Sequence, residues 1–349
     1  MENLFNRIYK DRIVLVTGHT GFKGSWLVYW LAQMGAKVIG YSLEAPTNPN
    51  HIELLKLSVD SIIGDIRDQE KLNKTIENYK PDIVFHLAAQ PLVRDSYTDP
   101  VNTYETNVIG TLKVFEACKK HNVKAIVNIT SDKAYENKEL ERGYKENDSL
   151  GGYDPYSSSK GCADLLANSY RNSFFNPAEY KKSHNTLLAS CRAGNVIGGG
   201  DWAKDRLVPD IYRSLHSKKV LKIRYPNATR PWQHVLDVVN GYLLLAQSNY
   251  FGAWNFGPNL KKTFKVKDIL SNIKRRNPEL RWKILKPKEV QESINLNLEI
   301  KKAKNILKWK PKWKIKKALE ETNKWYENFY NKKDINYLTI KQIKDFFKL

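Results

Sequence analysis

A glycine-rich turn between a strand-like run and a helix-like run constrains the fold of this chain more than any other feature. The stretch "RIVLVTGHTGFKGSWLVYWLAQMGA" places Gly18, Gly21 and Gly24 three residues apart, after a β-branched run and at the start of a helical period that we expect to begin at Gly24. Glycine lets such a turn close tightly, lets backbone N–H groups reach a pyrophosphate, and lets the helix pack on the strand. The turn therefore predicts a dinucleotide-binding site rather than a merely structural turn.

Strand-like and helix-like segments alternate as far as about residue 195. Short apolar runs are expected to form strands at 12–17, 37–42, 60–65, 82–88, 124–130 and 186–193, with helical periods at 23–36, 68–79, 106–120 and 154–170. Near-continuous apolar strands separated by helices are typical of an α/β fold with a doubly wound parallel sheet. In the first helix we expect Leu27, Trp30, Leu31 and Met34 to form the buried stripe, because they recur at three and four residues.

The pattern changes from about residue 196, where glycines, shorter elements and longer loops begin with "NVIGGGDWAKDRLVPD". We expect a dinucleotide-binding domain at 1–195 and a smaller α/β substrate-binding lobe at 196–330. The two would be interleaved, with part of 230–260 returning to the first domain. Residues 331–349 would form a basic C-terminal tail.

The basic charge is concentrated near the C-terminal end of the sequence. The chain has a net charge of +21, and residues 261–349 hold 26 basic and 10 acidic residues of the total. Such an excess suits nucleic acid, but no arginine or aromatic stripe interleaves the lysines, so a solvated helix surface and no nucleic-acid partner are favoured.

The remaining composition argues for a cytoplasmic protein. Cys118, Cys162 and Cys191 are widely spaced, which indicates neither a disulfide framework nor a metal site. No run of about 18 apolar residues exists and the first residues lack a signal-peptide core, so we expect no membrane partner.

The positions that would contact the cofactor follow the strands. An acidic residue ending the second strand would bind an adenosine ribose and an arginine would bind a 2'-phosphate, yet "GYSLEAPT" has neither there; Glu44 comes one step later, which favours NAD over NADP. Asp65 and Ile66 would lie near the adenine, although Asp65 could equally serve a turn. The other predicted cofactor contacts are Thr20, Phe22, Leu87, Ala88 and Ala89.

Tyr156 and Lys160 stand four apart on a predicted helix and so share one face. An ammonium group near a phenol lowers the phenol pKa from about 10, which would make Tyr156 a general base for a hydroxyl proton. Tyr337 and Lys341 have the same spacing by chance. Only the first pair follows the fifth strand of a dinucleotide-binding sheet, so we assign the chemistry to Tyr156 and Lys160.

These features together resemble the extended short-chain dehydrogenase/reductase superfamily. They are TGxxGxxG at 17–24, "HLAAQ" at 86–90, "TNVIGT" at 106–111, Ser131, and YxxxK at 156–160. Longer runs are similar to the sugar-nucleotide dehydratases that act on CDP-glucose, namely "VTGHTGFKGSWL", "AAQPLVRDSYTDP", "TSDKAYEN", "CRAGNVIGGGDWAKDRLVPD" and "RPWQHVLDVV". The resemblance is dense over residues 11–260 and looser towards 330.

The resemblance implies an NAD-dependent lyase that converts CDP-glucose to CDP-4-keto-6-deoxyglucose. Ser131 and Tyr156 would hydrogen-bond the 4-oxygen of the sugar, and Lys160 would hold the nicotinamide ribose. The implied substrate contacts are Gln90, Arg94, Asn195, Asp205, Arg206 and Arg230, with Asn195 and Arg230 at the diphosphate; a surface salt bridge is the alternative for Arg230. Asn107 would brace the fold. Relatives pair the helices at 106–119 and 156–170, which implies a homodimer or a tetramer.

The trio Ser131, Asp132 and Lys133 leaves one catalytic role open. In sister dehydratases an aspartate acid and a glutamate base follow the serine, whereas here Lys133 stands in the place of the glutamate. Lys133 could be the base, hold a water or polarise the keto group. Consecutive strand residues point to opposite faces, so the trio can converge on one sugar only if the strand has already turned.

Two other functions remain open on the sequence alone. A dehydratase or 4-epimerase for another nucleotide sugar (GDP-, dTDP- or UDP-hexose) would share most of these residues. A nucleotide-sensing or RNA-binding protein would use the basic C-terminal quarter, but the intact Tyr156 and Lys160 pair argues against a fold that has lost its catalysis.

Overall fold

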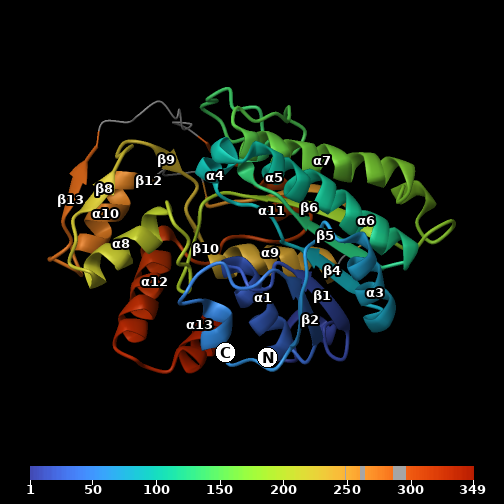
Figure 1. Cartoon of the computed structure of the whole chain (residues 1–349), viewed down its shortest axis with the longest axis horizontal. Helices are drawn as coiled ribbons and strands as arrows, with labels where there is room; N and C mark the ends of the chain where they lie inside the picture. Colours follow the sequence, from blue (N-terminus) through green and yellow to red (C-terminus); the bar gives the residue numbers. More distant parts are fainter. Residues whose placement is uncertain (248, 260–263, 286–295) are drawn as a thin grey trace.

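Seven parallel strands form the central sheet of the structure, a computed structural model that describes residues 1–247, 249–259, 264–285 and 296–349 (Figure 1). The strand order is β11-β6-β5-β4-β1-β2-β3, with parallel pairing throughout. Their bounds are β1 Ile13–Thr17, β2 Lys37–Ser42, β3 Asp60–Ile63, β4 Ile83–His86, β5 Ala125–Ile129, β6 Leu187–Ala193 and β11 Gly252–Phe256. The predicted doubly wound parallel sheet is confirmed.

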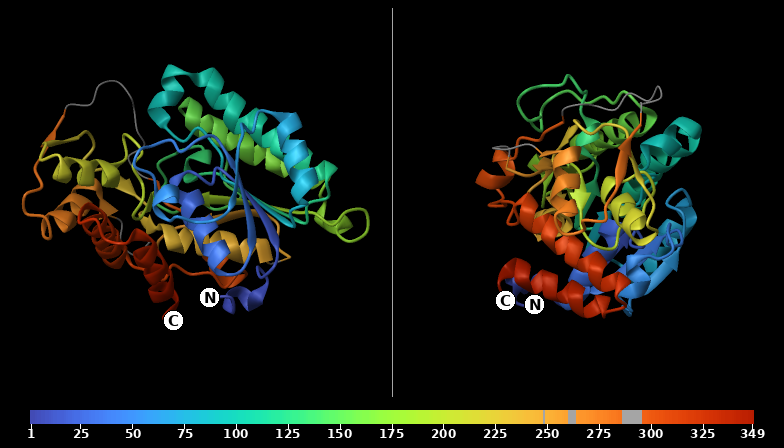
Figure 2. Two further views of the ribbon diagram at one scale, coloured as in Figure 1. Left: turned by 60° about the horizontal axis from the view of Figure 1, so that its bottom comes forward. Right: turned by 90° about the vertical axis from the view of Figure 1, so that its left-hand side faces the viewer.

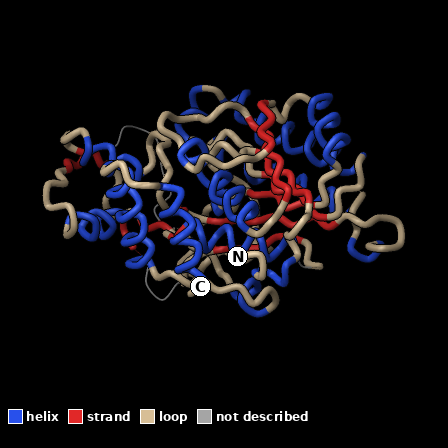
Figure 3. Tube along the Cα trace, turned by 90° about the horizontal axis from the view of Figure 1, so that it is seen from below, coloured by secondary structure: helices blue, strands red, loops and turns tan. Residues whose placement is uncertain are grey.

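Helices cover both faces of this sheet. One face packs against α1 (Phe22–Gln33) and α9 (Val235–Gln247), and the other against α3 (Gln69–Tyr79), α6 (Thr111–Lys120) and α7 (Pro155–Ser173). Figure 3 shows the strands running between the two helical layers. Short helices complete this part of the chain: α2 His51–Leu54, α4 Val93–Thr98, α5 Pro100–Tyr104, the π-helix η2 Glu105–Gly110, and the 3₁₀ turns η1 Leu4–Arg7, η3 Asp132–Ala134 and η4 Pro177–Glu179.

The first helix differs from its prediction in two respects. It begins at Phe22, after Gly21 as N-cap, and not at Gly24. Its burial is not a single stripe, because every residue from Gly24 to Leu31 is buried. Contacts on several sides explain this: α9 packs on α1, the Trp26 indole donates to the Gly199 carbonyl at 2.9 Å, and the Tyr29 hydroxyl donates to Asn336 at 2.7 Å.

Smaller elements assemble beside the carboxyl ends of the sheet strands. They comprise three strand pairs, β7 Val196–Ile197 with β10 Gln233–His234, β9 Thr229–Arg230 with β12 Phe264–Lys265, and β8 Leu221–Ile223 with β13 Trp282–Ile284, and the helices α8 Leu207–His216, α10 Val266–Lys274 and α12 Ile315–Tyr330. The short helix α11 Lys301–Asn305 packs instead on β11 of the central sheet. Helix α9 and strand β11 lie between these elements in sequence, yet they pack on the central sheet. Figure 2 shows the smaller elements grouped beside the main sheet.

The predicted basic tail after residue 330 forms a helix. Helix α13 (Ile335–Phe347) packs on α12 and on α1, with the Trp30 and Phe346 rings 6.0 Å apart. Both chain ends lie on the same side of the molecule (Figure 2). In the part of the chain that the structure describes, no helix has the length and apolar character needed to cross a bilayer.

Candidate active site

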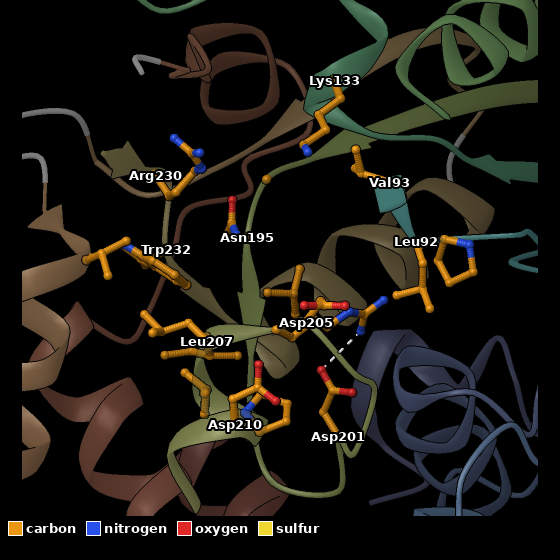
Figure 4. A pocket seen from close by; sticks show the side chains of 18 of the residues that line it. Leu92, Val93, Lys133, Asn195, Asp201, Asp205, Leu207, Asp210, Arg230 and Trp232 are labelled. Atoms are coloured by element: carbon orange, nitrogen blue, oxygen red, sulfur yellow. Dashed lines mark hydrogen bonds and ion pairs between the residues drawn. The ribbon is translucent and has the colours of Figure 1, made fainter. Parts of the chain in front are cut away.

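A cavity of about 320 Å³ lies between the carboxyl ends of the sheet strands and the smaller elements. Its walls come from the residues that follow β4, β5 and β6, from the start of α8, and from the segment around β8 and β9. Figure 4 looks into this pocket, with Leu92 and Val93 on one side and Trp232 and Arg230 on the other. Ligands of open α/β sheets bind in this kind of crevice.

The three glycines of the predicted pyrophosphate turn differ in the space around them. Gly18 has φ +72°, and a Cβ there would lie 2.7 Å from the Ala88 nitrogen. At Gly24 a Cβ would lie 2.1 Å from the Gly18 carbonyl oxygen. At Gly21 it would meet only that same oxygen, at 3.4 Å. Gly18 and Gly24 are therefore required by the fold, whereas Gly21 keeps a space beside the start of α1 clear.

The predicted adenine side is held by contacts within the protein. Thr20 Oγ1 lies 2.9 Å from Ser42 Oγ, and Ile66 is buried beneath Gly110. Asp65 accepts from the Arg67 backbone at 2.8 Å and pairs with its guanidinium at 2.6 Å, and these hydrogen bonds lower the pKa of the Asp65 carboxyl. Asp65, two residues after β3, thus closes a turn and does not line the pocket.

The loop after β4 is fixed by buried polar groups. The Leu87 and Ala88 amides both donate to Thr17 Oγ1 at 3.2 Å. The Gln90 backbone N–H donates to Asn107 Oδ1, and the Gln90 carbonyl accepts from Asn107 Nδ2. The same Nδ2 also donates to Ser159 Oγ at 2.9 Å. The bracing role expected for Asn107 is confirmed. The Gln90 side-chain amide donates to the Leu92 carbonyl and to Thr103 Oγ1. Gln90 does not line the pocket, in contrast to the other predicted substrate contacts.

Helix α7 places Tyr156 on the pocket wall. Asp154 caps the helix by accepting from the Ser157 amide at 2.9 Å, and Pro155 occupies the first turn. The Tyr156 amide donates to Ser96 Oγ at 3.1 Å, which ties the start of α7 to α4. Lys160 follows one turn later; it is buried and, unlike Tyr156, does not line the pocket. The sequence therefore fixes both side chains through the cap and the helical repeat.

The trio of Ser131, Asp132 and Lys133 lies where the chain has left its strand. Strand β5 ends at Ile129, Ser131 caps the 3₁₀ turn η3, and all three residues line the pocket. Ser131 Oγ donates to Asp132 Oδ1 at 3.0 Å and accepts from the Lys133 amide at 3.2 Å. The sequence predicted that these three side chains can face one sugar only if the strand has already ended. It has ended here, because a 3₁₀ turn replaces the alternation of a strand.

Asp132 is the most unusual member of the trio. Its side chain is 3% exposed and its Oδ2 atom has no hydrogen-bond partner among the described residues. Burial raises the pKa of the carboxyl, against the opposing effects of Lys133 and of the Ser131 hydroxyl. A buried carboxyl with one free oxygen favours the protonated form, which can donate a proton to a ligand.

The electrostatics of Tyr156 differ from the prediction. Burial raises the pKa of Tyr156 to about 12, and the hydrogen bond with Ser131 only partly offsets this. Lys160 is not among the groups that lower it. Burial and the nearby Lys23 lower the pKa of Lys160 to about 7, so its ammonium is only partly charged near neutrality. The expected lowering of the Tyr156 pKa by Lys160 is therefore wrong for the protein alone, because desolvation outweighs the charge.

The other predicted substrate contacts meet in the pocket from separate elements. Arg94, Asn195, Asp205, Arg206 and Arg230 all line it. Arg206 pairs with the buried Asp201 at 3.0 Å (dashed line in Figure 4). The Arg206 charge also acts on Tyr156, which places this guanidinium nearer the reactive end than the sequence indicated.

Three pocket cations were missed by the sequence reasoning, namely Lys23, Lys222 and Arg224. Lys23, the variable residue before Gly24, lines the pocket, and burial lowers its pKa to about 8. A lysine in the first turn of a helix opposes the helix dipole, and that local signal could have identified it. Arg224 follows β8 and also lines the pocket. No local pattern marks Arg224, because the folding of the smaller elements brings it there.

Comparison with known proteins identifies a family and a close relative. Residues 15–322 match the family model described as GDP-mannose 4,6 dehydratase. The chain is 49% identical over 348 residues to the CDP-glucose 4,6-dehydratase of Salmonella typhimurium, with 97% of each chain covered.

Solved structures share the fold at lower identity. The UDP-glucose 4-epimerase of Thermotoga maritima, solved with UDP-glucose, superposes with a TM-score of 0.79 at 22% identity, covering 91% of this chain and 99% of the other. The dTDP-glucose 4,6-dehydratase of Bacillus anthracis, solved with NAD, gives a TM-score of 0.77 at 23% identity, covering 92% and 98%.

Proposed function

The chain belongs to the GDP-mannose 4,6 dehydratase family, and on that basis we propose that it is a CDP-glucose 4,6-dehydratase. The reaction removes water from CDP-glucose and yields CDP-4-keto-6-deoxyglucose. Oxidation at C4, loss of water across C5 and C6, and reduction at C6 follow one another within one turnover.

The observation that carries this proposal is the meeting of Ser131, Asp132, Lys133 and Tyr156 in one pocket of a chain 49% identical to a CDP-glucose 4,6-dehydratase along nearly its whole length. Oxidation alone would need only the serine and the tyrosine. A buried acid beside them supplies the group that loss of the 6-hydroxyl requires.

The residues present fit NAD as the resident cofactor. A Cβ at Gly21 would enter the space beside the first turn of α1, where the helix N-terminus favours a pyrophosphate. Thr20, Phe22, Asp65 and Ile66 would hold the adenosine half, and Leu87, Ala88, Ala89 and Lys160 the nicotinamide half. Bound there, NAD would supply the hydride acceptor for oxidation at C4 and the hydride donor for reduction at C6.

The residues of the chain handle the proton of the first step. Tyr156 takes the 4-hydroxyl proton, and Ser131 donates a hydrogen bond to the 4-oxygen. The raised pKa of Tyr156 means that the phenol must be assisted. The Arg206 guanidinium, which acts to lower the pKa of Tyr156, supplies part of this assistance.

The elimination step uses the other two members of the trio. Burial raises the pKa of Asp132, and in its protonated form this carboxyl donates its proton to the departing 6-hydroxyl. Lys133 stands on the pocket wall, where its amine or a water that it holds removes the C5 proton. Its Nζ lies 6.0 Å from the centre of the Tyr156 ring, so it approaches the substrate from the same side as the tyrosine.

The charge of the pocket suits a sugar linked to a diphosphate. Seven lysine and arginine side chains line it against four aspartates. A nucleoside diphosphate brings two negative charges and so reduces this excess. Arg230 and Asn195 contribute from the wall formed by β9 and β7 (Figure 4), and the planar guanidinium suits two phosphate oxygens at once.

We further propose a homodimer built on α7 and the helices before α6. Large apolar side chains are exposed there: Val101 is 65%, Ile109 44% and Leu165 56% exposed. Such a group of apolar side chains is typical of an interface. Leu165→Glu should shift the mass in solution from dimer to monomer by light scattering, whereas Ile284→Glu, at an exposed apolar residue of β13, should not. A monomeric parent protein would exclude the dimer.

Product mass tests the catalytic proposal. Purified protein with NAD is incubated with CDP-, UDP-, dTDP- and GDP-glucose and GDP-mannose, and each product is weighed by mass spectrometry. We expect loss of one water from CDP-glucose. An unchanged mass with an altered sugar would identify an epimerase, and loss of water from another nucleotide sugar alone would replace CDP-glucose as the substrate.

A further inference from the structure

Two arginines from separate parts of the chain converge on one carboxylate oxygen in the pocket. Arg94 Nη1, on α4, lies 3.1 Å from Asp205 Oδ1. Both terminal nitrogens of Arg224, which follows β8, lie 3.4 Å from that same oxygen. All three residues line the pocket, and Figure 4 shows Asp205 between its two walls. The pairs therefore bridge the main sheet and the smaller elements.

The backbone at Asp205 is held in an uncommon conformation. Asp205 has φ +57°, in the left-handed region that aspartate and asparagine tolerate better than most residues. The preceding loop is anchored below by Asp201, which accepts from the Ala203 amide at 3.0 Å and pairs with Arg206. These contacts present the Asp205 carboxylate to both arginines.

Two guanidinium groups that share one oxygen form an incomplete anion site. Arginine is suited to phosphate, which offers several oxygens in the geometry of its N–H groups. The two ion pairs are solvent-accessible, with Arg94 44% and Asp205 42% exposed, and exposed pairs contribute little stability. A doubly charged group can therefore displace the single carboxylate at small cost.

We propose that Asp205 occupies the place of a substrate phosphate, and that Arg94 and Arg224 form an arm of the diphosphate site which is released when substrate displaces the carboxylate. This inference rests on the proposed function for the identity of the substrate. It adds Arg224 to the binding residues. It also changes the expected role of Asp205 from a substrate contact to an internal competitor.

The competitor role gives an expectation opposite to that for a binding residue. In a calorimetric titration with CDP, Asp205→Asn should tighten binding by about three- to tenfold, the range that one or two exposed ion pairs supply. Asparagine keeps the tolerance for positive φ, and Asp205→Gly provides a second variant with the same expectation. Arg224→Gln should weaken CDP binding.

The matched control is Asp210→Asn, which removes the same charge from the same pocket. Asp210 pairs with Arg213, so its loss frees neither Arg94 nor Arg224. It should tighten CDP binding less than Asp205→Asn does. In the Arg94→Gln, Arg224→Gln background, the effect of Asp205→Asn should disappear, because no released arginine remains.

Three results would overturn the inference. They are weaker or unchanged CDP binding by both Asp205 variants, equal tightening by Asp210→Asn, and full persistence of the effect without the two arginines. Failure of the proposed function is separable. If the parent binds UDP, dTDP or GDP instead of CDP, the substrate assignment fails, and the same variants are titrated with that nucleotide, because the inference concerns the diphosphate. A parent that binds none of them contradicts both.

Discussion

At the scale of single residues, Asp132 differs from Asp201 and Asp210 of the same pocket, because its second oxygen has no hydrogen-bond partner among the described residues. Asp201 and Asp210 each pair directly with an arginine. Asp132 instead accepts from the Ser131 hydroxyl and keeps Oδ2 free among the described residues, 3.0 Å from where a Cβ on Gly194 would stand. Burial thus raises the pKa of a carboxyl that lines the pocket.

Asp132→Asn should separate oxidation from water loss. The amide keeps the shape of the side chain but cannot donate an acidic proton, and a general acid typically contributes 10²- to 10⁴-fold. We expect NADH absorbance to accumulate after substrate is added while release of product slows by that range. Tyr156→Phe is the control, because it should block the first step and give no absorbance. Normal product formation by Asp132→Asn would remove the aspartate from the mechanism.

Lys133→Met should distinguish the roles that the sequence left open. If the lysine or its water removes the C5 proton, the variant should lose exchange of the C5 hydrogen with deuterated solvent, measured by mass spectrometry, while C4 oxidation persists. Methionine preserves the length of the side chain without its charge. Undiminished exchange with normal turnover would leave Lys133 as a polar residue on the rim of a turn.

The residue scale also shows where sequence reasoning reaches its limit. Spacing and position were enough to place Tyr156, Lys160 and the trio in one region. They could not give the pKa of Tyr156, because desolvation depends on the atoms packed around the phenol and not on its neighbour four residues away. Arg224 was not predicted, because the folding of the smaller elements brings it to the pocket and no local sequence pattern marks it.

At the scale of secondary-structure elements, the glycine turn combines two glycines that the fold requires, Gly18 and Gly24, with Gly21, which keeps space clear beside α1. Gly21→Val should leave the fold intact and weaken NAD binding by about 10- to 100-fold, the equivalent of one lost hydrogen bond to a charged group. A Cβ at Gly21 meets only the Gly18 oxygen, at 3.4 Å. Calorimetric titration with NAD measures this. Retention of NAD binding by the folded variant would contradict the cofactor site.

Gly24→Ala is the matched contrast. Its Cβ would lie 2.1 Å from the Gly18 carbonyl oxygen, so the backbone of the turn must move. We expect a lower melting temperature for Gly24→Ala and a nearly unchanged one for Gly21→Val. Equal destabilisation by both changes would mean that Gly21 is also a packing residue.

Element types were predictable along the sheet, whereas burial was not. Six of the seven sheet strands and the helices between them follow from apolar runs and helical periods, whereas β11 was covered only by the expectation that part of 230–260 returns to the first domain. The complete burial of α1 does not, because it depends on α9 and α13, which lie more than 200 residues further along the chain. The π-helix η2 was read as part of one continuous helix, since its side chains continue the same apolar pattern.

At the scale of the whole molecule, buried histidines couple folding to pH. Burial lowers the pKa of His51, His86 and His234 to about 3, whereas an unfolded histidine titrates near 6.5. The unfolded chain therefore binds more protons below pH 6.5, and the free energy of unfolding falls as the pH falls. Each group contributes up to about 1.4 kcal/mol per pH unit. Asp237 has the opposite effect on stability. Burial raises its pKa to about 7, so the folded chain binds this proton before the unfolded chain does, which offsets the contribution of one histidine.

Urea denaturation at pH 6.5, 6.0, 5.5 and 5.0 measures this effect. The parent should lose stability over that window, and His51→Gln should lose less per pH unit, because glutamine does not titrate. The Oγ atom of Ser25, 2.9 Å from His51, can still bond the amide. An equal pH slope for parent and variant would show that His51 is not held neutral in the folded protein.

The position of α13 has a consequence for the order in which the chain is made. Residues 335–347 leave the ribosome more than 300 positions after residues 22–33, yet the Tyr29 hydroxyl bonds Asn336 and Trp30 packs on Phe346. At synthesis rates of about 5–20 residues per second, this face of α1 stays uncovered for roughly 15–60 s. Until then the Tyr29 and Trp30 side chains lack the contacts that α13 provides in the folded protein.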